Sequence, residues 1–220
     1  CGDRATLATT RGADSLQPHM TPFNQKFVFT LLAILLVIVS PSGPAASGWQ
    51  AGGESKLSPI KLIYPSGLAL DDRGDLYISD IGAHRVFKLN SRGRLAVIAG
   101  TGEGGFSGDG GPATKAQLNA PHDLAFDEEG RLLLADTYNH RIRRIDRLGV
   151  ITTIAGTGPV GSASGTYGGD GGPAVAALLN APAGLLFDRL GDLLIADQGN
   201  NCVRMLHPNG KITLVAGVPG

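Results

Sequence analysis

Short apolar runs, each bounded by turn residues, recur along the chain from about residue 59 to residue 220. In the middle part of this region they are 123–127, 132–136, 141–145 and 151–154. Runs of four to six residues have the length of β-strands and are too short for typical helices. The pattern therefore predicts an all-β region built from short strands.

The set of four runs occurs three times. The copies open at Pro65, Pro121 and Pro182, so they are spaced by 56 and 61 residues. Self-similarity at such a period indicates a repeat architecture, and four short antiparallel strands per repeat are the content of one propeller blade. A β-solenoid usually has a shorter period, and a sandwich needs no repeated sequence. The propeller is therefore the favoured interpretation.

The link between the first and second runs of each copy reads Asp-x-x-Gly, ending at Gly74, Gly130 and Gly191. Aspartate can cap its own turn through its side chain, and glycine can adopt the positive φ that a tight turn needs. These links predict tight hairpins.

Three motifs stand out: Pro-x-Gly-Leu-Ala-x-Asp at 65–71, Gly-x-Leu-Tyr-Ile-x-Asp at 74–80 and Asn-His-Arg-Ile at 139–142, and variants of each occur in the other copies. They resemble the NHL repeat over roughly residues 59–220. The resemblance implies a β-propeller, commonly of about six blades, and no particular reaction. We expect an incomplete NHL-type propeller: about three four-stranded antiparallel blades in an open arc, at 59–118, 119–179 and 180–220, with further blades outside this sequence.

The N-terminal part differs from the repeats. Lys26 precedes an apolar run at 27–39, and small residues follow at 45–47, which is the order of a secretory signal peptide. The run is short for a membrane span, which needs about 20 residues. We therefore predict a hydrophobic signal helix within 20–47 and a secreted or periplasmic product, with a membrane anchor at 27–39 as the alternative. Residues 1–19 are expected to be a non-native or disordered extension, and 48–58 a linker.

Composition narrows the function classes. Nineteen basic and nineteen acidic residues balance, which argues against nucleic acid as a partner. Cys1 and Cys202 lie far apart, so the sequence supports neither a zinc site nor a disulfide framework. No cofactor is predicted; a Ca²⁺ or Zn²⁺ ion in a complete propeller stays open without a residue that favours it.

Two long connectors, 101–120 and 157–181, join the repeats, and both contain Gly-Asp-Gly-Gly-Pro-Ala followed by an Ala-rich stretch that predicts a short helix. Asp109 and Asp170 occupy equivalent places in them. One carboxylate per loop is few for Ca²⁺, so a cap on the following turn is favoured over a cation site. Tyr167 is a candidate contact residue for a ligand, because loops carry the function of a propeller.

Other polar residues fall at equivalent places in the copies. Asp80, Asp136 and Asp197 end the second runs, and His84 and His140 directly precede the third. A catalytic residue is needed only once, so recurrence indicates structural roles. Arg141, Arg143, Arg144 and Arg147 form a basic cluster, which we interpret as a solvated outer strand face.

His122 and Asp123 break the repeat, because Ser66 with Gly67 and Ala183 with Gly184 stand in their places. Their position predicts the entry of an inner strand, where they could face the central channel and bind a ligand or metal. Adjacent strand residues point to opposite faces, so the two side chains need not cooperate.

Two functions compete. The first is a non-catalytic module that binds a protein, peptide or glycan on its loop face. The second is a metal-dependent propeller enzyme of the gluconolactonase-like or amidating-lyase-like kind, which the resemblance also permits. Such an enzyme needs several ligands from different blades, whereas the inner runs here are apolar apart from His122 and Asp123. The sequence therefore favours the binding module, with a membrane as partner only if the signal segment is retained as an anchor.

Overall fold

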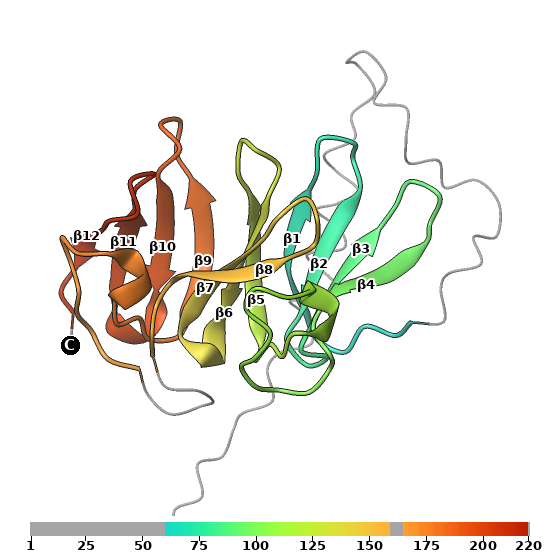
Figure 1. The fold of residues 1–220 in the computed structure, drawn as a ribbon, viewed down its shortest axis with the longest axis horizontal. Helices are drawn as coiled ribbons and strands as arrows, with labels where there is room; N and C mark the ends of the chain where they lie inside the picture. Colours follow the sequence, from blue (N-terminus) through green and yellow to red (C-terminus); the bar gives the residue numbers. More distant parts are fainter. Residues whose placement is uncertain (1–59, 159–164, 220) are drawn as a thin grey trace, which may run out of the picture. The chain divides into compact units, whose positions relative to one another are not determined.

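The computed structural model describes residues 60–158 and 165–219, all within the unit Gly48–Gly220 (Figure 1). The predicted extension 1–19, signal segment 20–47 and linker 48–58 lie outside the described residues, and these predictions stay predictions. No helix in the part described is long and apolar enough to cross a membrane.

Twelve strands form three sheets of four. The first holds β1 (Pro65–Leu70), β2 (Leu76–Asp80), β3 (Arg85–Leu89) and β4 (Leu95–Ala99). The second holds β5 (Pro121–Phe126), β6 (Leu132–Asp136), β7 (Arg141–Ile145) and β8 (Ile151–Ala155). The third holds β9 (Pro182–Phe187), β10 (Leu193–Asp197), β11 (Cys202–Leu206) and β12 (Ile212–Gly217). Neighbours in each sheet follow the chain order and pair antiparallel, which confirms three propeller blades.

Four 3-10 helices complete the described elements. The predicted helices of the connectors form as single turns, η1 (Ala113–Lys115) and η3 (Ala174–Ala176). Two more, η2 (Thr137–Asn139) and η4 (Gln198–Asn200), follow the second strands of their blades. Each connector turn begins after a proline, as expected from the fixed φ of that residue.

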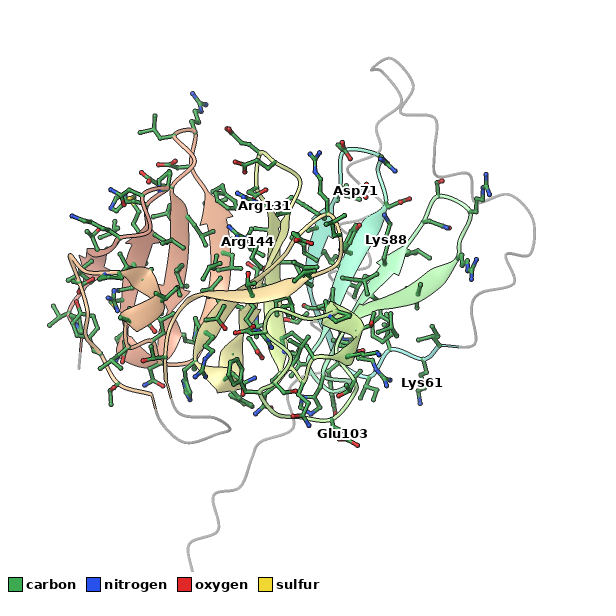
Figure 2. The ribbon with its side chains drawn as sticks, viewed as in Figure 1. Lys61, Asp71, Lys88, Glu103, Arg131 and Arg144 are labelled. Carbon is green, nitrogen blue, oxygen red and sulfur yellow. The ribbon has the colours of Figure 1, made fainter. Side chains whose placement is uncertain are left out.

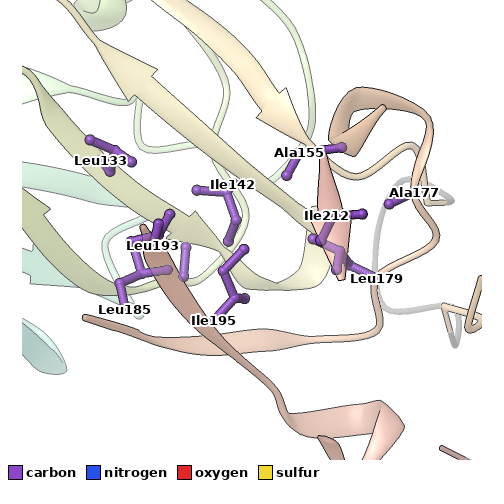
Figure 3. Close-up of a cluster of buried hydrophobic side chains, with 11 residues drawn as sticks. Leu133, Ile142, Ala155, Ala177, Leu179, Leu185, Leu193, Ile195 and Ile212 are labelled. Carbon is purple, nitrogen blue, oxygen red and sulfur yellow. The ribbon is translucent and has the colours of Figure 1, made fainter. Parts of the chain in front are cut away.

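Strand β6 shows how one sequence supplies two hydrophobic cores. Successive strand residues point to opposite faces. Leu133 and Ala135 therefore join the core shared with the third blade, whereas Leu132 and Leu134 join the core shared with the first. All five residues of β6 are buried because both faces of the middle sheet are covered. Figure 3 shows the core between the second and third blades, where Leu133 and Ile142 meet side chains of the third blade.

The connectors close these junctions. Ala113, Ala116 and Leu118 are buried in the core between the first and second blades. Backbone bonds tie the connector to both blades: the Gly100 N–H donates to the carbonyl of Ala113 at 3.0 Å, and the Ala113 N–H donates to the carbonyl of Gly149 at 2.8 Å. The connector after the second blade repeats this arrangement with Ala174, Ala177 and Leu179 in the next core.

The Asp-x-x-Gly hairpins form as predicted. Asp71 Oδ1 accepts hydrogen bonds from the N–H groups of Arg73 at 3.0 Å and Asp75 at 2.9 Å. Gly74 has a φ of 79°, in the left-handed region that glycine adopts at low cost.

The three blades form an open row. The inner strand β5 lies beside both β1 and β9 (Figure 1). At the two ends the outer blade faces stay exposed, with 60% of Leu70 in the first blade and 64% of Leu186 in the third accessible to solvent. This agrees with the predicted open arc.

Candidate functional site

The connector aspartates act as counter-ions of buried arginines. Arg143 Nη2 lies 2.7 Å from Asp109 Oδ1, and Thr153 Oγ1 donates to Asp109 Oδ2 at 2.6 Å. Arg204 and Asp170 form the same pair in the third blade at 2.8 Å. Both arginine side chains are completely buried. No side-chain cap is present on η1 or η3, so the favoured interpretation of these aspartates as caps of the following turn was wrong.

Aromatic rings cover the two guanidinium groups. The Arg204 guanidinium lies 4.7 Å from the centre of the Tyr167 ring, and that of Arg143 lies 5.0 Å from the Phe106 ring. The Tyr167 hydroxyl donates a hydrogen bond to Asp170, which raises the pKa of Tyr167 to about 12. The Tyr167 side chain thus belongs to the same cluster as Asp170, while its ring stays half-exposed.

His122 and Asp123 serve different junctions. Asp123 Oδ1 accepts the N–H of Leu124 at 2.9 Å, and Oδ2 accepts the N–H of Leu185 in the third blade at 2.8 Å. His122 Nδ1 lies 3.3 Å from Ser66 Oγ in the first blade. Both residues lie where the register of β5 against β6 shifts, between Pro121 and Leu124. The structure therefore places both at the blade junctions without joining them in one constellation.

The aspartates that end the second strands hold the connectors. Asp136 Oδ1 accepts the N–H of Asn119 at 2.7 Å, and Asp197 Oδ1 accepts that of Asn180 at 2.7 Å. Burial raises the pKa of Asp136 to about 6, against hydrogen bonds from Asn119 and Asn139 and the charge of Arg143, which lower it. Burial also raises the pKa of Asp197. Neither carboxylate caps the turn that follows it, η2 or η4, so the predicted turn-capping role is wrong for Asp136 and Asp197, whereas Asp80 Oδ1 accepts the N–H of Ala83 in its following turn at 2.9 Å.

The recurring histidines also act across junctions. His84 Nδ1 accepts the N–H of Ala120 at 3.1 Å, and His140 Nδ1 accepts that of Ala181 at 2.9 Å. The basic cluster divides: Arg143 is buried, so the predicted solvated face is wrong there, while Arg147 is exposed. Among the described residues, no three His, Cys, Asp or Glu side chains lie together as metal ligands.

Two cavities open between the blades on the side of the Asp-x-x-Gly hairpins. The first-junction groove, of about 490 Å³, lies between the first and second blades and includes Asp71, Tyr77, Lys88 and Phe126 in its walls. The second-junction groove, of about 590 Å³, lies between the second and third blades. Its walls include Phe126, Arg131, Arg144, Phe187 and Leu193.

In the first-junction groove, the ammonium group of Lys88 is neutralised by carboxylates of its own blade. Lys88 Nζ lies 2.8 Å from Asp75 Oδ2 and 3.1 Å from Asp71 Oδ2. Burial alone would lower the pKa of Lys88, but its contacts with Asp75, Tyr77 and Asp71 raise it, so the ammonium stays charged. Burial likewise acts to raise the pKa of Asp71, yet hydrogen bonds from the Asp75 backbone and Lys88 bring it below its usual value.

The second-junction groove is different. Arg144 pairs with Leu133 and Thr152 in the sheet and so takes the place that Lys88 has in the first blade (Figure 2). Arg131 Nε lies 2.6 Å from Asp127 Oδ2, and its Nη2 lies 2.7 Å from Glu129 Oε2. Within residues 60–158 and 165–219, no hydrogen bond or ion pair engages the guanidinium of the half-buried Arg144.

Comparison with known proteins agrees with this architecture. Residues 74–166 match the Teneurin NHL domain. NHL repeat-containing protein 2 of Gallus gallus is 34% identical over 108 residues, which cover 48% of this chain and 14% of that protein. The chain belongs to the NHL-repeat β-propeller proteins. A solved structure of unknown function from Bacteroides thetaiotaomicron has the same fold, with a TM-score of 0.56, 21% identity, and coverage of 69% of this chain and 35% of that one.

The NHL chain covers only a small part of the teneurins it resembles. Teneurin-1 of Mus musculus is 31% identical over 195 residues, which are 82% of this chain and 7% of that protein. The similarity therefore concerns the NHL repeats, and whole-protein activities of such relatives do not follow from it.

The sequence patterns did not reveal the two grooves of the NHL blades. The available signal is the residue four positions after the first aspartate of each hairpin: Asp75 in the first repeat stands where Arg131 stands in the second. Its meaning depends on Lys88 and Arg144, which lie on the third strands and approach the hairpins only after the sheets have formed.

Proposed function

We propose that this chain is an exported, non-catalytic NHL module that binds a protein, peptide or glycan. The observation that supports this most is the use of its carboxylates. Both oxygens of Asp123 accept backbone N–H groups, and both oxygens of Asp109 are bonded to Arg143 and Thr153. A carboxylate committed to such bonds is poorly placed to act as a general base or metal ligand.

The surface between the blades supports binding. Cavities of about 490 and about 590 Å³ fall in the size range of ligand pockets, and aromatic side chains such as Phe126 line both. The connector face, with Tyr167 half-exposed, stays a further predicted contact surface.

The test compares binding with catalysis on the purified full-length chain. Metal content is measured after purification, and lactone and amidating-lyase substrates are assayed with and without a chelator. We expect no turnover above the buffer rate. Stoichiometric metal with chelator-sensitive turnover that disappears in His122→Ala, and persists in the control His207→Gln on the hairpin side, would replace the binding proposal with the metal-dependent enzyme.

Export is tested separately. If 27–39 is the apolar region of a signal peptide, N-terminal sequencing of material exported by a bacterial host should begin after the small residues at 45–47. Recovery of the uncleaved chain from the membrane would favour the anchor instead, and recovery from the cytosol would contradict export.

A further inference from the structure

The second-junction groove contains a cation, Arg144, for which the described residues supply no acceptor. Lys88 and Arg144 hold the same place on β3 and β7, and both project toward the following blade. Lys88 meets two carboxylates of its own blade at 2.8 and 3.1 Å. Arg144 meets none among the residues that the structure describes. The two grooves thus carry a cation at the same place and differ in whether that cation has a carboxylate partner.

One exchange between the repeats explains the difference. In the first blade, Asp71 Oδ2 and Asp75 Oδ2 face Lys88. In the second blade, Arg131 stands at the place of Asp75 and holds Asp127 Oδ2 at 2.6 Å. Arg131 therefore replaces one of the two carboxylates and forms an ion pair with the other, so that Arg144 has no carboxylate partner among the described residues.

We infer that the second-junction groove binds a peptide segment in which a carboxylate side chain stands beside an apolar one. The carboxylate pairs with Arg144, in the way that Asp71 and Asp75 pair with Lys88. Arginine presents two parallel N–H donors that match a carboxylate. This inference rests on the proposed binding function and names its site and the chemistry of its ligand.

The walls of the groove favour a peptide over an isolated acid. Phe126, Phe187, Leu193 and Leu206 line it, and 82% of Leu190 on the hairpin rim is exposed. A volume of about 590 Å³ exceeds what a carboxylate group fills, and an apolar side chain of the ligand would cover the aromatic floor.

Acidic residues of the groove are largely engaged. Arg131 holds Asp127 and Glu129. Asp188 Oδ1 accepts the N–H groups of Leu190 at 2.8 Å and Asp192 at 3.0 Å. Glu128, on the exposed rim, and Asp188, through its Oδ2, remain without an ion pair among the described residues. We therefore expect Glu128→Gln to strengthen binding and added salt to weaken it, because the attraction is between charges near the surface.

The experiment titrates the full chain with acetyl-Leu-Glu-Leu-amide and with its Gln counterpart, by calorimetry and by the NMR signals of the arginine Nε–H groups. We expect the Glu peptide to bind at least about tenfold more tightly, since hydrogen bonds to charged groups outweigh neutral ones by that order. Arg144→Gln should abolish the difference and Arg144→Lys should keep part of it, whereas Lys88→Gln and Arg189→Gln should leave it intact.

Two substitutions test whether Arg131 causes the difference between the grooves, because each gives one blade the residue that the other has at the equivalent position. Arg131→Asp should give Arg144 an internal partner and remove binding of the Glu peptide. Asp75→Arg should engage Asp71, release Lys88 and create a second site in the first-junction groove. Circular dichroism and thermal melting confirm that each variant is folded.

Equal affinity for the Glu and Gln peptides, or binding that survives in both Arg144→Gln and Arg131→Asp, would overturn the inference. Glucuronate that binds as tightly as the Glu peptide would overturn the assignment to a peptide. Failure of the proposed function has a separate readout, because it appears as chelator-sensitive turnover and not as loss of peptide binding.

Discussion

The guanidinium of Arg143 lies 2.7 Å from the carboxylate of Asp109, and the arginine is fully buried while 36% of the aspartate side chain is exposed. The pair joins strand β7 to the connector that precedes it, and Arg204 with Asp170 repeats it one blade later. In the first blade Phe87 fills the corresponding place and packs near Ile60 and Leu62. The segment that enters each blade is thus held by an ion pair in the second and third blades and by apolar packing in the first.

Asp109→Ala should destabilise the chain because it leaves the buried charge of Arg143 poorly compensated. Arg143 would keep the carbonyls of Gln117 and Ser107 as acceptors but lose its nearest counter-charge. We expect a loss of about 2 kcal/mol in the free energy of unfolding, less than for a fully buried pair because Asp109 is partly exposed. Denaturant titration measures it, with the exposed Asp72→Ala as a control expected within about 0.5 kcal/mol of wild type. Identical midpoints for both variants would contradict the role of the pair.

Asp136 should make stability depend on pH. Burial raises its folded-state pKa to about 6, above the value of 3.8 for the free group, so the folded chain binds the extra proton between these values. The associated stability is complete below about pH 4 and is lost as the pH rises through about 6. The stability of wild type relative to Asp136→Asn should therefore fall between about pH 4 and pH 7, by up to about 3 kcal/mol. Chemical unfolding of both proteins across this range measures the difference, and a constant difference would disprove it.

Substitutions at Gly156 and Gly149 distinguish the cost of backbone strain from the cost of a steric clash. Both have positive φ, at 90° and 80°. A Cβ on Gly156 would lie 2.3 Å from the carbonyl oxygen of His140, whereas one on Gly149 would meet nothing within 4 Å. We expect Gly149→Ala to cost about 1 kcal/mol and Gly156→Ala at least about 2 kcal/mol more, measured by thermal melting. A similar loss for both would mean that the close approach at Gly156 is relieved by movement of the loop.

The core between the second and third blades should carry much of the stability of the third. Ile195 is completely buried in it (Figure 3), whereas Leu186, on the neighbouring strand, is 64% exposed. Ile195→Ala should cost about 2–5 kcal/mol through lost contacts and a cavity, and Leu186→Ala within about 0.5 kcal/mol. Equilibrium unfolding of the two variants gives the comparison. A large loss for Leu186→Ala would indicate that its face is covered in solution.

The sequence by itself determined the local structure of the blades. The period of the apolar runs predicted the strands, and the Asp71 hairpin followed from its own residues, because the turn is stabilised by bonds between groups two to four positions apart. The three repeats predicted three blades in the same way, since each copy carries a complete set of strands.

Tertiary structure alone decided which polar groups meet. Asp123 reaches the N–H of Leu185, 62 residues away, and Arg143 reaches Asp109 across 34 residues. The partner of a charged side chain depends on how neighbouring sheets are placed, and alternation along one strand says only which face it is on. Arg144 illustrates this limit: its charge is evident in the sequence, but its lack of a partner within the described part of the chain follows from Arg131 holding Asp127 in the folded hairpin.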